Sequence, residues 1–156
     1  IPKDAARMVA IGDVDEVNSL LGVAALHAEG EMLARIRMIQ NDLFDLGADL
    51  ATPGDDFEPG EMTLRMVARQ VTRLEEEIDV MNEDMAVLTS FILPGGTALA
   101  AALHVARATA RRAERAAPLP TPARATASRT GVSAMCVLLT GIERPPPRVS
   151  GRRGRL

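Results

Sequence analysis

The apolar residues between positions 32 and 50 recur at alternating intervals of four and three, and this spacing restricts the fold more than any other feature of the chain. A heptad spacing places every such residue on one side of an α-helix, whereas a strand with one buried face needs a period of two. The sequence therefore predicts a helix over residues 31–51 that buries one seam against other helices. The seam consists of Met32, Ile36, Ile39, Leu43, Leu46 and Leu50.

Three further segments show a helical spacing of apolar residues. We expect a helix over 4–28 that stops before Gly30, a helix over 61–84, and a helix that Thr97 caps and that continues to about residue 117. Long helices with short connections predict an all-α, up-and-down bundle. The expected apolar positions are Ile11, Val14, Val17, Leu21 and Ala24 in the first of these helices, and Leu64, Val67, Val71, Leu74, Ile78 and Met81 in the second.

The residue types limit the kind of core that the bundle can have. Apolar residues make up 47% of the 156-residue chain but aromatic residues only 2%, so the core must be aliphatic. Cys136 is the single cysteine, which excludes an intrachain disulfide and agrees with a reducing, cytoplasmic compartment. No apolar stretch approaches the ~20 residues that a membrane span needs, and we therefore expect no membrane partner.

Charge and proline content change abruptly near residue 116. Residues 1–115 carry a formal charge of −9, whereas residues 116–156 carry +6 and six of the ten prolines. We expect one helical domain at 1–117 and an irregular or disordered Pro/Arg-rich tail at 118–156. A change of reading frame in GC-rich DNA is a hypothesis that explains the switch. The tail has no aromatic residues between its arginines, which disfavours nucleic acid as a partner.

The expected last helix carries a stripe of cationic side chains in an otherwise acidic region. At 100° per residue its polar residues share one arc, next to small apolar residues. Stacked guanidinium groups repel one another unless an anion lies against them, and their planar forks suit phosphate oxygens. A polyphosphate ligand is one interpretation, and a solvated helix face with charge pairs four residues apart is the other. The arc contains His104, Arg107, Arg111, Glu114 and Arg115.

Two other places offer candidate functional residues. Asp15, Asn18 and Ser19 share one face of the first helix, where a carboxylate can pair with an arginine of the last helix, within the chain or across a subunit boundary. An ordinary polar helix face is the alternative. Phe91 precedes a Pro-Gly-Gly turn in an irregular loop, where it either serves a ligand or plugs the end of the bundle.

Motifs for other kinds of site are absent from the sequence. Neither G-x-x-x-x-G-K-[ST] nor G-x-G-x-x-G occurs, so the common phosphate-cradling loops are missing. His27 and His104 lack metal-ligand spacing, and we predict no metal site built from protein ligands.

Five segments together resemble one enzyme family. Residues 12–19, 39–53, 90–96, 103–107 and 111–115 are similar to successive motifs of the trimeric, propanediol-utilisation type of ATP:cob(I)alamin adenosyltransferases. The resemblance covers residues 2–117, and its motifs are long and correctly ordered. It implies a five-helix bundle, of which four helices are recognisable here, that assembles as a homotrimer with active sites between subunits. It also implies transfer of the adenosyl group of ATP to the cobalt of cob(I)alamin, with Mg²⁺ and a flavin reductase as further participants.

The resemblance assigns roles to individual residues. Phe91 resembles the aromatic residue that displaces the lower cobalt ligand and leaves four-coordinate cob(II)alamin. Asp15 resembles the partner of Arg111 in an intersubunit salt bridge. The remaining residues of the implied nucleotide site are Lys3, Arg107, Arg112, Glu114 and Arg115.

The sequence also departs from the family pattern at both ends of the matching region. Family members have a Thr-Gly-Asp-x-Gly loop that wraps ATP and a fifth helix with an Asn-Arg-Leu-Ser-Asp motif, and this sequence has neither. A non-catalytic helical binding module and an inactive relative are therefore alternatives to the enzyme.

Overall fold

The computed structural model describes residues 6–52, 64–83, 90 and 92–116. Its elements are α1 (Ala6–Ala25), α2 (Gly30–Ala51), α3 (Ala68–Glu83) and α4 (Ala98–Ala116), and no strand occurs within those ranges. This confirms the all-α prediction. Lys3, Phe91 and the tail at 118–156 lie outside the described residues.

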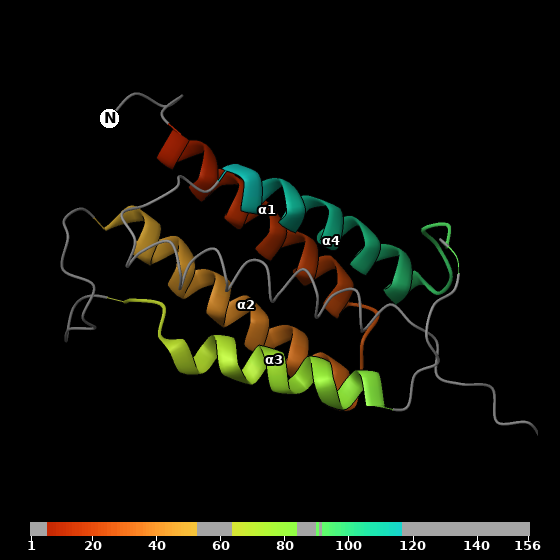
Figure 1. The fold of residues 1–156 in the computed structure, drawn as a ribbon. Helices are drawn as coiled ribbons and strands as arrows, with labels where there is room; N and C mark the ends of the chain where they lie inside the picture. Colours follow the sequence, from red (N-terminus) through yellow and green to blue (C-terminus); the bar gives the residue numbers. More distant parts are fainter. Residues whose placement is uncertain (1–5, 53–63, 84–89, 91, 117–156) are drawn as a thin grey trace, which may run out of the picture.

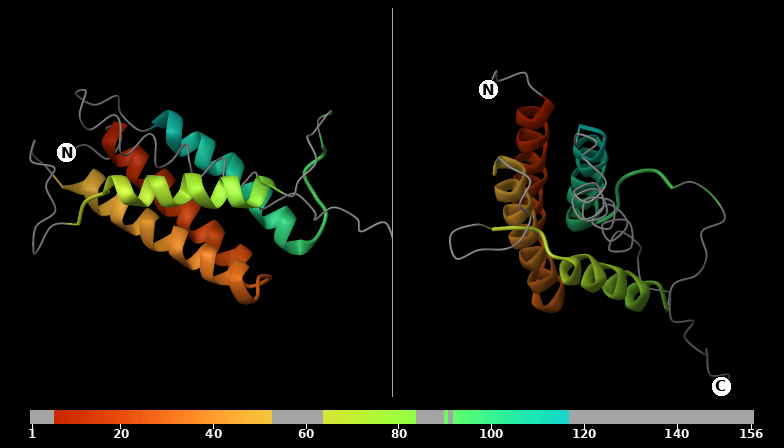
Figure 2. Two further views of the ribbon diagram at one scale, coloured as in Figure 1. Left: turned by 60° about the horizontal axis from the view of Figure 1, so that its bottom comes forward. Right: turned by 60° about the vertical axis from the view of Figure 1, so that its left-hand side comes forward.

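The first helix is the common neighbour of two others. α1 packs closely against both α2 and α4, and α4 runs antiparallel to it (Figure 1). α3 runs beside α2 in the view of Figure 1 but turns away from it in the right-hand view of Figure 2. Buried side chains of all four helices still join one cluster. Within the described part of the chain, no helix is long and apolar enough to cross a membrane.

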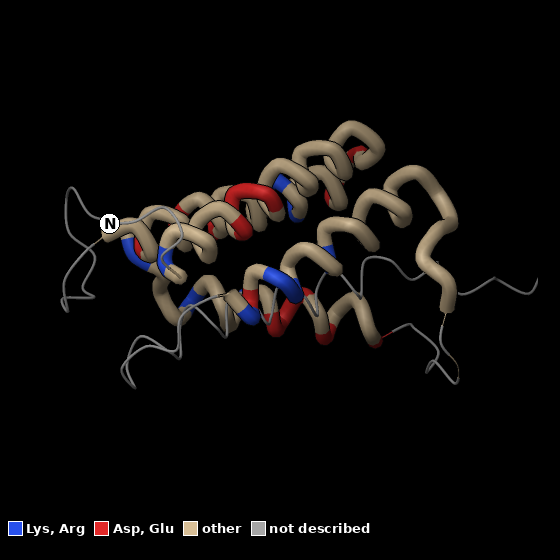
Figure 3. The backbone as a smooth tube through the Cα atoms, turned by 90° about the horizontal axis from the view of Figure 1, so that it is seen from above, with Lys and Arg blue, Asp and Glu red and all other residues tan. Residues whose placement is uncertain are grey.

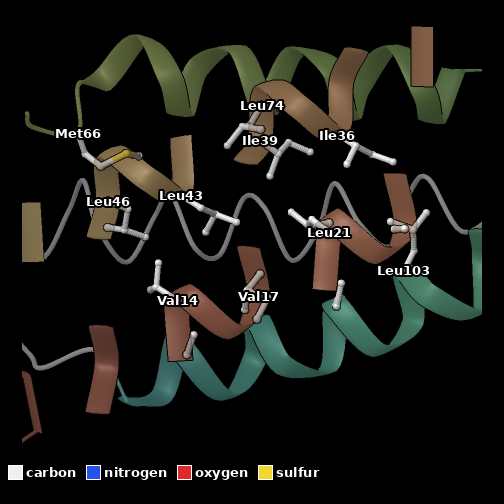
Figure 4. Packing of buried hydrophobic residues seen from close by; sticks show 14 of the residues in the cluster. Val14, Val17, Leu21, Ile36, Ile39, Leu43, Leu46, Met66, Leu74 and Leu103 are labelled. Atoms are coloured by element: carbon white, nitrogen blue, oxygen red, sulfur yellow. The ribbon is translucent and has the colours of Figure 1, made fainter. Parts of the chain in front are cut away.

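An aliphatic cluster fills the interior, as the absence of Trp and Tyr requires. Figure 4 shows these side chains converging from all four helices. The predicted heptad seam is confirmed, because five of its six residues are buried and Met32 is partly buried against the cluster. The largest buried side chains are Val17, Leu21, Ile36, Ile39, Leu46, Leu74 and Leu103.

Small residues let α4 approach α1 closely. Ala106, Ala110 and Ala113 are each at most 1% exposed, and Ala10 of α1 is fully buried. Beyond the fully buried Leu103, this side of α4 carries small apolar side chains, so the helix backbones can pack tightly there.

The helix boundaries depend on local hydrogen bonds. α1 ends at Ala25, three residues before the predicted end, and a tight turn follows in which the His27 amide donates to the Ala24 carbonyl at 3.0 Å. Gly30 is not the stop of α1 but the first residue of α2, where its φ of +55° suits glycine. The predicted Thr97 cap is confirmed, since its Oγ1 accepts from the Ala100 amide at 3.1 Å.

The third helix begins later than its apolar spacing predicts. α3 starts at Ala68, and Leu64 is half exposed rather than part of the seam. Side chains replace helical hydrogen bonds here. The Met66 amide donates to Asp49 Oδ2 at 3.3 Å, and the Val67 amide donates to Gln70 Oε1 at 2.9 Å. Apolar periodicity cannot detect such competition for backbone donors, so the predicted start at residue 61 is wrong for 64–67, while 61–63 lie outside the described residues.

Acidic residues of α2 hold the beginning of α3. Asp49 and Arg65 form a buried ion pair, with 2.7 Å between Oδ1 and Nη1. One turn away, the side-chain Nε2 of Gln70 donates to both Asp42 Oδ1 and Asp45 Oδ2 at 2.9 Å. The attachment of α3 to α2 thus combines apolar burial with charged hydrogen bonds, which specify one register between the two helices.

Among the α2 carboxylates that contact the beginning of α3, Asp42 has a shifted pKa. Arg73 also donates to it, and Arg73 in turn pairs with Glu77. Burial raises the pKa of Asp42 above its usual value, because desolvation outweighs the hydrogen bond from Gln70 and the charge of Arg73, while neighbouring Asp45 raises it further.

Removal of Asp49 should destabilise the bundle strongly. We expect Asp49→Ala to lower the free energy of unfolding by about 3–5 kcal/mol, because it leaves the buried Arg65 guanidinium without its carboxylate. Urea unfolding measures the effect. The double variant Asp49→Leu/Arg65→Met should recover most of the loss, since it removes both charges. A single-variant loss below about 1 kcal/mol would contradict the assigned role of the pair.

Asp42 should give the stability a pH dependence of known sign. Its folded-state pKa lies above the usual 3.8, so the native chain binds more protons than the unfolded chain between the two values. The stabilising contribution is therefore present at low pH and lost as the pH rises through the folded pKa. Compared with Asp42→Asn, which cannot titrate, the wild type should gain free energy of unfolding as the pH falls from neutral. A difference that stays constant with pH in urea titrations would refute this.

Candidate functional site

Acidic and basic positions lie interspersed along the described helices (Figure 3), so charge alone does not mark one face as the site. The members of the predicted arginine stripe make different contacts. They pair within α4 or line a cavity, whereas the adjacent Arg112, which is not part of the predicted arc, pairs with α1.

Arg112 connects α4 to α1. Its Nε donates to Asp13 Oδ1 at 3.0 Å, and its Nη2 donates to Glu16 Oε2. The hydrogen bond with Asp13, followed by the charges of both carboxylates, raises the pKa of Arg112 above its usual value. A pairing between an acid of the first helix and an arginine of the last was one of two interpretations of the sequence, and Asp13 and Glu16, rather than Asp15, form such pairs within one chain.

Arg111 and Arg115 make contacts inside α4. Arg111 Nη1 donates to Glu114 Oε2 at 2.9 Å, and Arg115 Nη1 donates to the Arg111 carbonyl at the same distance. Both guanidinium groups are solvent-exposed, whereas Glu114 and Arg107 are half-buried. The charge pair three residues apart is what a solvated face would have, and the exposed cations are what an anion would need, so these contacts fit either interpretation of the stripe.

A cavity of about 680 Å³ lies between α4 and the turn before it. His104, the buried histidine of the predicted arc, contributes to its wall together with the cationic end of the helix. Gly96 in this turn has a φ of +99°, a backbone conformation that favours glycine. The lining residues are Pro94, Gly95, Ala101, His104, Val105, Ala108, Thr109, Arg112 and Arg115.

A second cavity of about 490 Å³ lies between α1 and α2, and we call it the α1–α2 groove. Asp15 lines it and forms no ion pair among the described residues. Phe44 stands beside it with 66% of its surface exposed, which is unusual in a chain with three phenylalanines. The groove is lined by Met8, Ile11, Gly12, Val14, Asp15, Asn18, Leu43, Phe44, Gly47, Ala48 and Ala51.

The two cavities share no lining residue, and three predicted site residues, Arg107, Arg111 and Glu114, line neither of them. Asp15 belongs to the groove, while Arg112 and Arg115 belong to the cavity on α4. Of the other predicted site residues, Phe91 and Lys3 lie outside the described residues. Within the described ranges, no three His, Cys, Asp or Glu side chains gather as metal ligands.

Sequence reasoning missed the helical glycines of α1 and α2 and the contact that Gln40 makes between these helices. Gln40 of α2 donates through Nε2 to the Asn18 carbonyl of α1 at 3.1 Å and lies 3.5 Å from where a Cβ of Gly22 would be. By contrast, a Cβ added at Gly12 or Gly47 would meet nothing within 4 Å in this chain. Glycine inside a helix costs about 1 kcal/mol relative to alanine, and that cost was the available signal.

Comparison with known proteins identifies similar sequences. A family model described as cobalamin adenosyltransferase matches residues 1–131. The corrinoid adenosyltransferase of Mycobacterium leprae is 46% identical over 121 residues, which cover 75% of this chain and 63% of the relative. That of Bacillus subtilis is 38% identical, with 72% and 58% covered. The human corrinoid adenosyltransferase MMAB is 36% identical, with 73% and 47% covered. The chain thus spans about three fifths or less of the length of these relatives.

Solved structures agree with the sequence matches. A phenylalanine-to-alanine variant of the PduO-type ATP:corrinoid adenosyltransferase from Lactobacillus reuteri, complexed with cobalamin and ATP, superposes with a TM-score of 0.76 at 32% identity. The match covers 92% of this chain and 81% of that chain. An arginine-to-lysine variant of the same enzyme, complexed with ATP, has the same TM-score and covers 82% of its chain.

Proposed function

The chain belongs to the cobalamin adenosyltransferase family, and on this premise we propose that it transfers the 5′-deoxyadenosyl group of ATP to cob(I)alamin. The products are adenosylcobalamin and triphosphate. The relatives named above are corrinoid adenosyltransferases. Both L. reuteri structures are complexed with ATP, and one of them also with cobalamin. We place the reaction in the cytoplasm, where reducing conditions suit both the single Cys136 and a cob(I) substrate.

The separation between two residues supports the assignment of roles to Phe91 and Arg111. The two L. reuteri variants change a phenylalanine and an arginine that lie twenty positions apart, which is also the separation of Phe91 and Arg111 here. We therefore propose that Phe91 displaces the lower ligand of cob(II)alamin. Four-coordinate cobalt then accepts an electron at a potential that a flavin reductase can reach.

Arg111 and its neighbours act on the nucleotide in this proposal. Cobalt(I) attacks the 5′ carbon of ATP, a Co–C bond forms, and the C–O bond breaks with its electron pair leaving on the triphosphate. Negative charge grows on the leaving group, so preplaced guanidinium groups stabilise the transition state more than the ground state. Arg111 and Arg115 are exposed and suited to this role, with Arg107 and Lys3 as further cations.

Glu114 fits the coordination of Mg²⁺ that accompanies ATP. Mg²⁺ keeps several waters and binds through one or two carboxylates together with substrate phosphates. The Glu114 carboxylate is half-buried and already lies beside the Arg111 guanidinium, so an ion held there would be next to the proposed triphosphate position. Bound Mg²⁺ would neutralise part of the charge on the leaving triphosphate.

A homotrimer completes the proposed site. Asp15 lines the α1–α2 groove, to which α4 contributes no residue, whereas Arg111 lies on α4 beside Glu114. We therefore propose that Asp15 pairs with Arg111 of a neighbouring copy. The groove supports this assembly in two ways. Phe44 is mostly exposed, and Gly12 and Gly47 have open space where a Cβ would be, which allows another helix to approach the backbone closely.

Spectroscopy of the cobalt tests the activity directly. With ATP, Mg²⁺ and reduced cobalamin, we expect a new sharp absorbance band from four-coordinate cob(II)alamin, followed by formation of adenosylcobalamin. Arg111→Gln should lower kcat by about a hundredfold, because it removes a donor to the leaving group. Arg69→Gln, an equal charge change on the exposed side of α3, should leave kcat unchanged. An unchanged spectrum from a protein that circular dichroism shows to be folded would identify a non-catalytic relative.

A substitution at a glycine of the α1–α2 groove can test assembly of the trimer without disturbing the fold of the monomer. We expect Gly47→Gln to leave the monomer fold intact and to raise its stability by up to about 1 kcal/mol, since helix propensity improves and nothing within the chain is displaced. The same variant should abolish the trimer in sedimentation equilibrium, because the new side chain occupies the groove. Gly22→Ala is the matched control, and its Cβ would contact Gln40 inside the chain. If the Gly47→Gln variant formed a trimer as tightly as the wild type, the proposed interface would be wrong.

A further inference from the structure

We propose that Arg112 is a positioning residue, whose fork to Asp13 and Glu16 sets the register of α4 on α1 and thereby the placement of Arg111 and Arg115. This role rests on the proposed adenosyl transfer but differs from a direct contact between Arg112 and the nucleotide. Two charged hydrogen bonds from one planar guanidinium reach two carboxylates of the neighbouring helix. A fork engaged in this way restrains both the rotation and the translation of α4.

The apolar packing between α1 and α4 specifies the register of the two helices only weakly, so polar groups are needed to fix it. Leu103 is fully buried near the beginning of α4, but the rest of the apolar buried face is alanine, with Ala106, Ala110 and Ala113 almost fully buried. Methyl groups permit close approach but form low ridges that interdigitate weakly, so they specify the helix register less sharply than leucines would. Ion pairs are well suited to select one register among several of similar apolar burial.

The acidic turn of α1 is arranged so that it serves two surfaces. Asp13 and Glu16 are three residues apart and lie on the same side of the helix, facing Arg112. Asp15 lies about 160° around the helix from Asp13 and lines the α1–α2 groove instead. We call the pairing of Arg112 with Asp13 and Glu16 the clamp. Because it fixes α4 against α1, it also fixes the position of Asp15 relative to the arginines on α4.

The neighbouring arginines move with the helix that the clamp holds. Arg115 donates to the Arg111 carbonyl, and Arg111 donates to Glu114, so these contacts lie within α4. A slip or rotation of α4 would carry both guanidinium groups away from the leaving triphosphate. Displacements of about 1 Å are enough to cost up to a hundredfold in rate.

A mutant cycle distinguishes the clamp from direct phosphate binding. We compare Arg112→Gln, the double variant Asp13→Asn/Glu16→Gln, and the combination of all three changes. If Arg112 acts through α4, the first two variants should lower kcat to a similar extent, by about tenfold or more, and the combination should be no worse than either. Arg112→Lys, which keeps the charge but lacks the fork, should retain only part of the activity.

Direct phosphate binding makes the opposite prediction for the carboxylates. If Arg112 held the triphosphate, removal of Asp13 and Glu16 charges would free its guanidinium and leave kcat unchanged or lower the KM for ATP. That result would overturn the proposal. So would a loss of stability in the double variant without any change in kcat well below its melting temperature, because a purely structural pair would behave in that way. Glu76→Gln and Arg69→Gln, on the exposed side of α3, control for the charge changes.

Urea unfolding of the same variants tests the role of Arg112 independently of the proposed function. If Arg112 pairs with Asp13 and Glu16 as proposed, the shift of the urea midpoint in the combined variant should be smaller than the sum of the shifts in the two separate variants, whether or not the protein is active. If the wild type fails to form adenosylcobalamin, the proposed function is wrong, and the urea cycle still decides whether the fork couples α4 to α1. Additive midpoint shifts would overturn the clamp even in an active enzyme.

Discussion

The burial of aliphatic side chains along α1 is the interaction on which the rest of the structure depends. This helix packs against both α2 and α4, and its buried residues Val17 and Leu21 lie at the centre of the cluster. With no Trp or Tyr to contribute large contact areas, the chain gains its stability from many interlocking Leu, Ile and Val side chains. Since the proposed functional residues of α1 and α4 lie on the outside of these packed faces, the core decides where they stand.

Charged residues then select one arrangement among those that the apolar core allows. On one side of the bundle, Asp42 and Asp49 of α2 hold the beginning of α3. On the other side, Asp13 and Glu16 of α1 hold α4 through Arg112. In both places an acid of an early helix engages an arginine of a later one, so the acidic surplus of residues 1–115 has a structural use. The net charge of this region therefore says little about its ligands.

The candidate site could be predicted from the sequence only in part. The residue types and spacing of α4 allowed either an anion-binding stripe or a solvated helix face, and the family resemblance pointed to ATP and a corrinoid. The spacing could not tell that Arg112 faces α1 while Arg111 pairs along its own helix, because residues one apart differ by about 100° and only packing shows which direction is inward. The α1–α2 groove, with Gly12, Gly47 and exposed Phe44, was likewise invisible, since its residues come from two helices.

The sequence by itself determined the helical class, the heptad seam, the aliphatic nature of the core and the cap at Thr97, because these follow from local spacing and backbone chemistry. The tertiary structure decided the start of α3 at Ala68, where carboxylates of α2 take over hydrogen bonds that a longer helix would have made. It also decided which acid meets which arginine and placed Asp15 apart from the Arg112 clamp. Those outcomes depend on competition between groups that are distant in the chain, and this competition has no signature in the order of the residues.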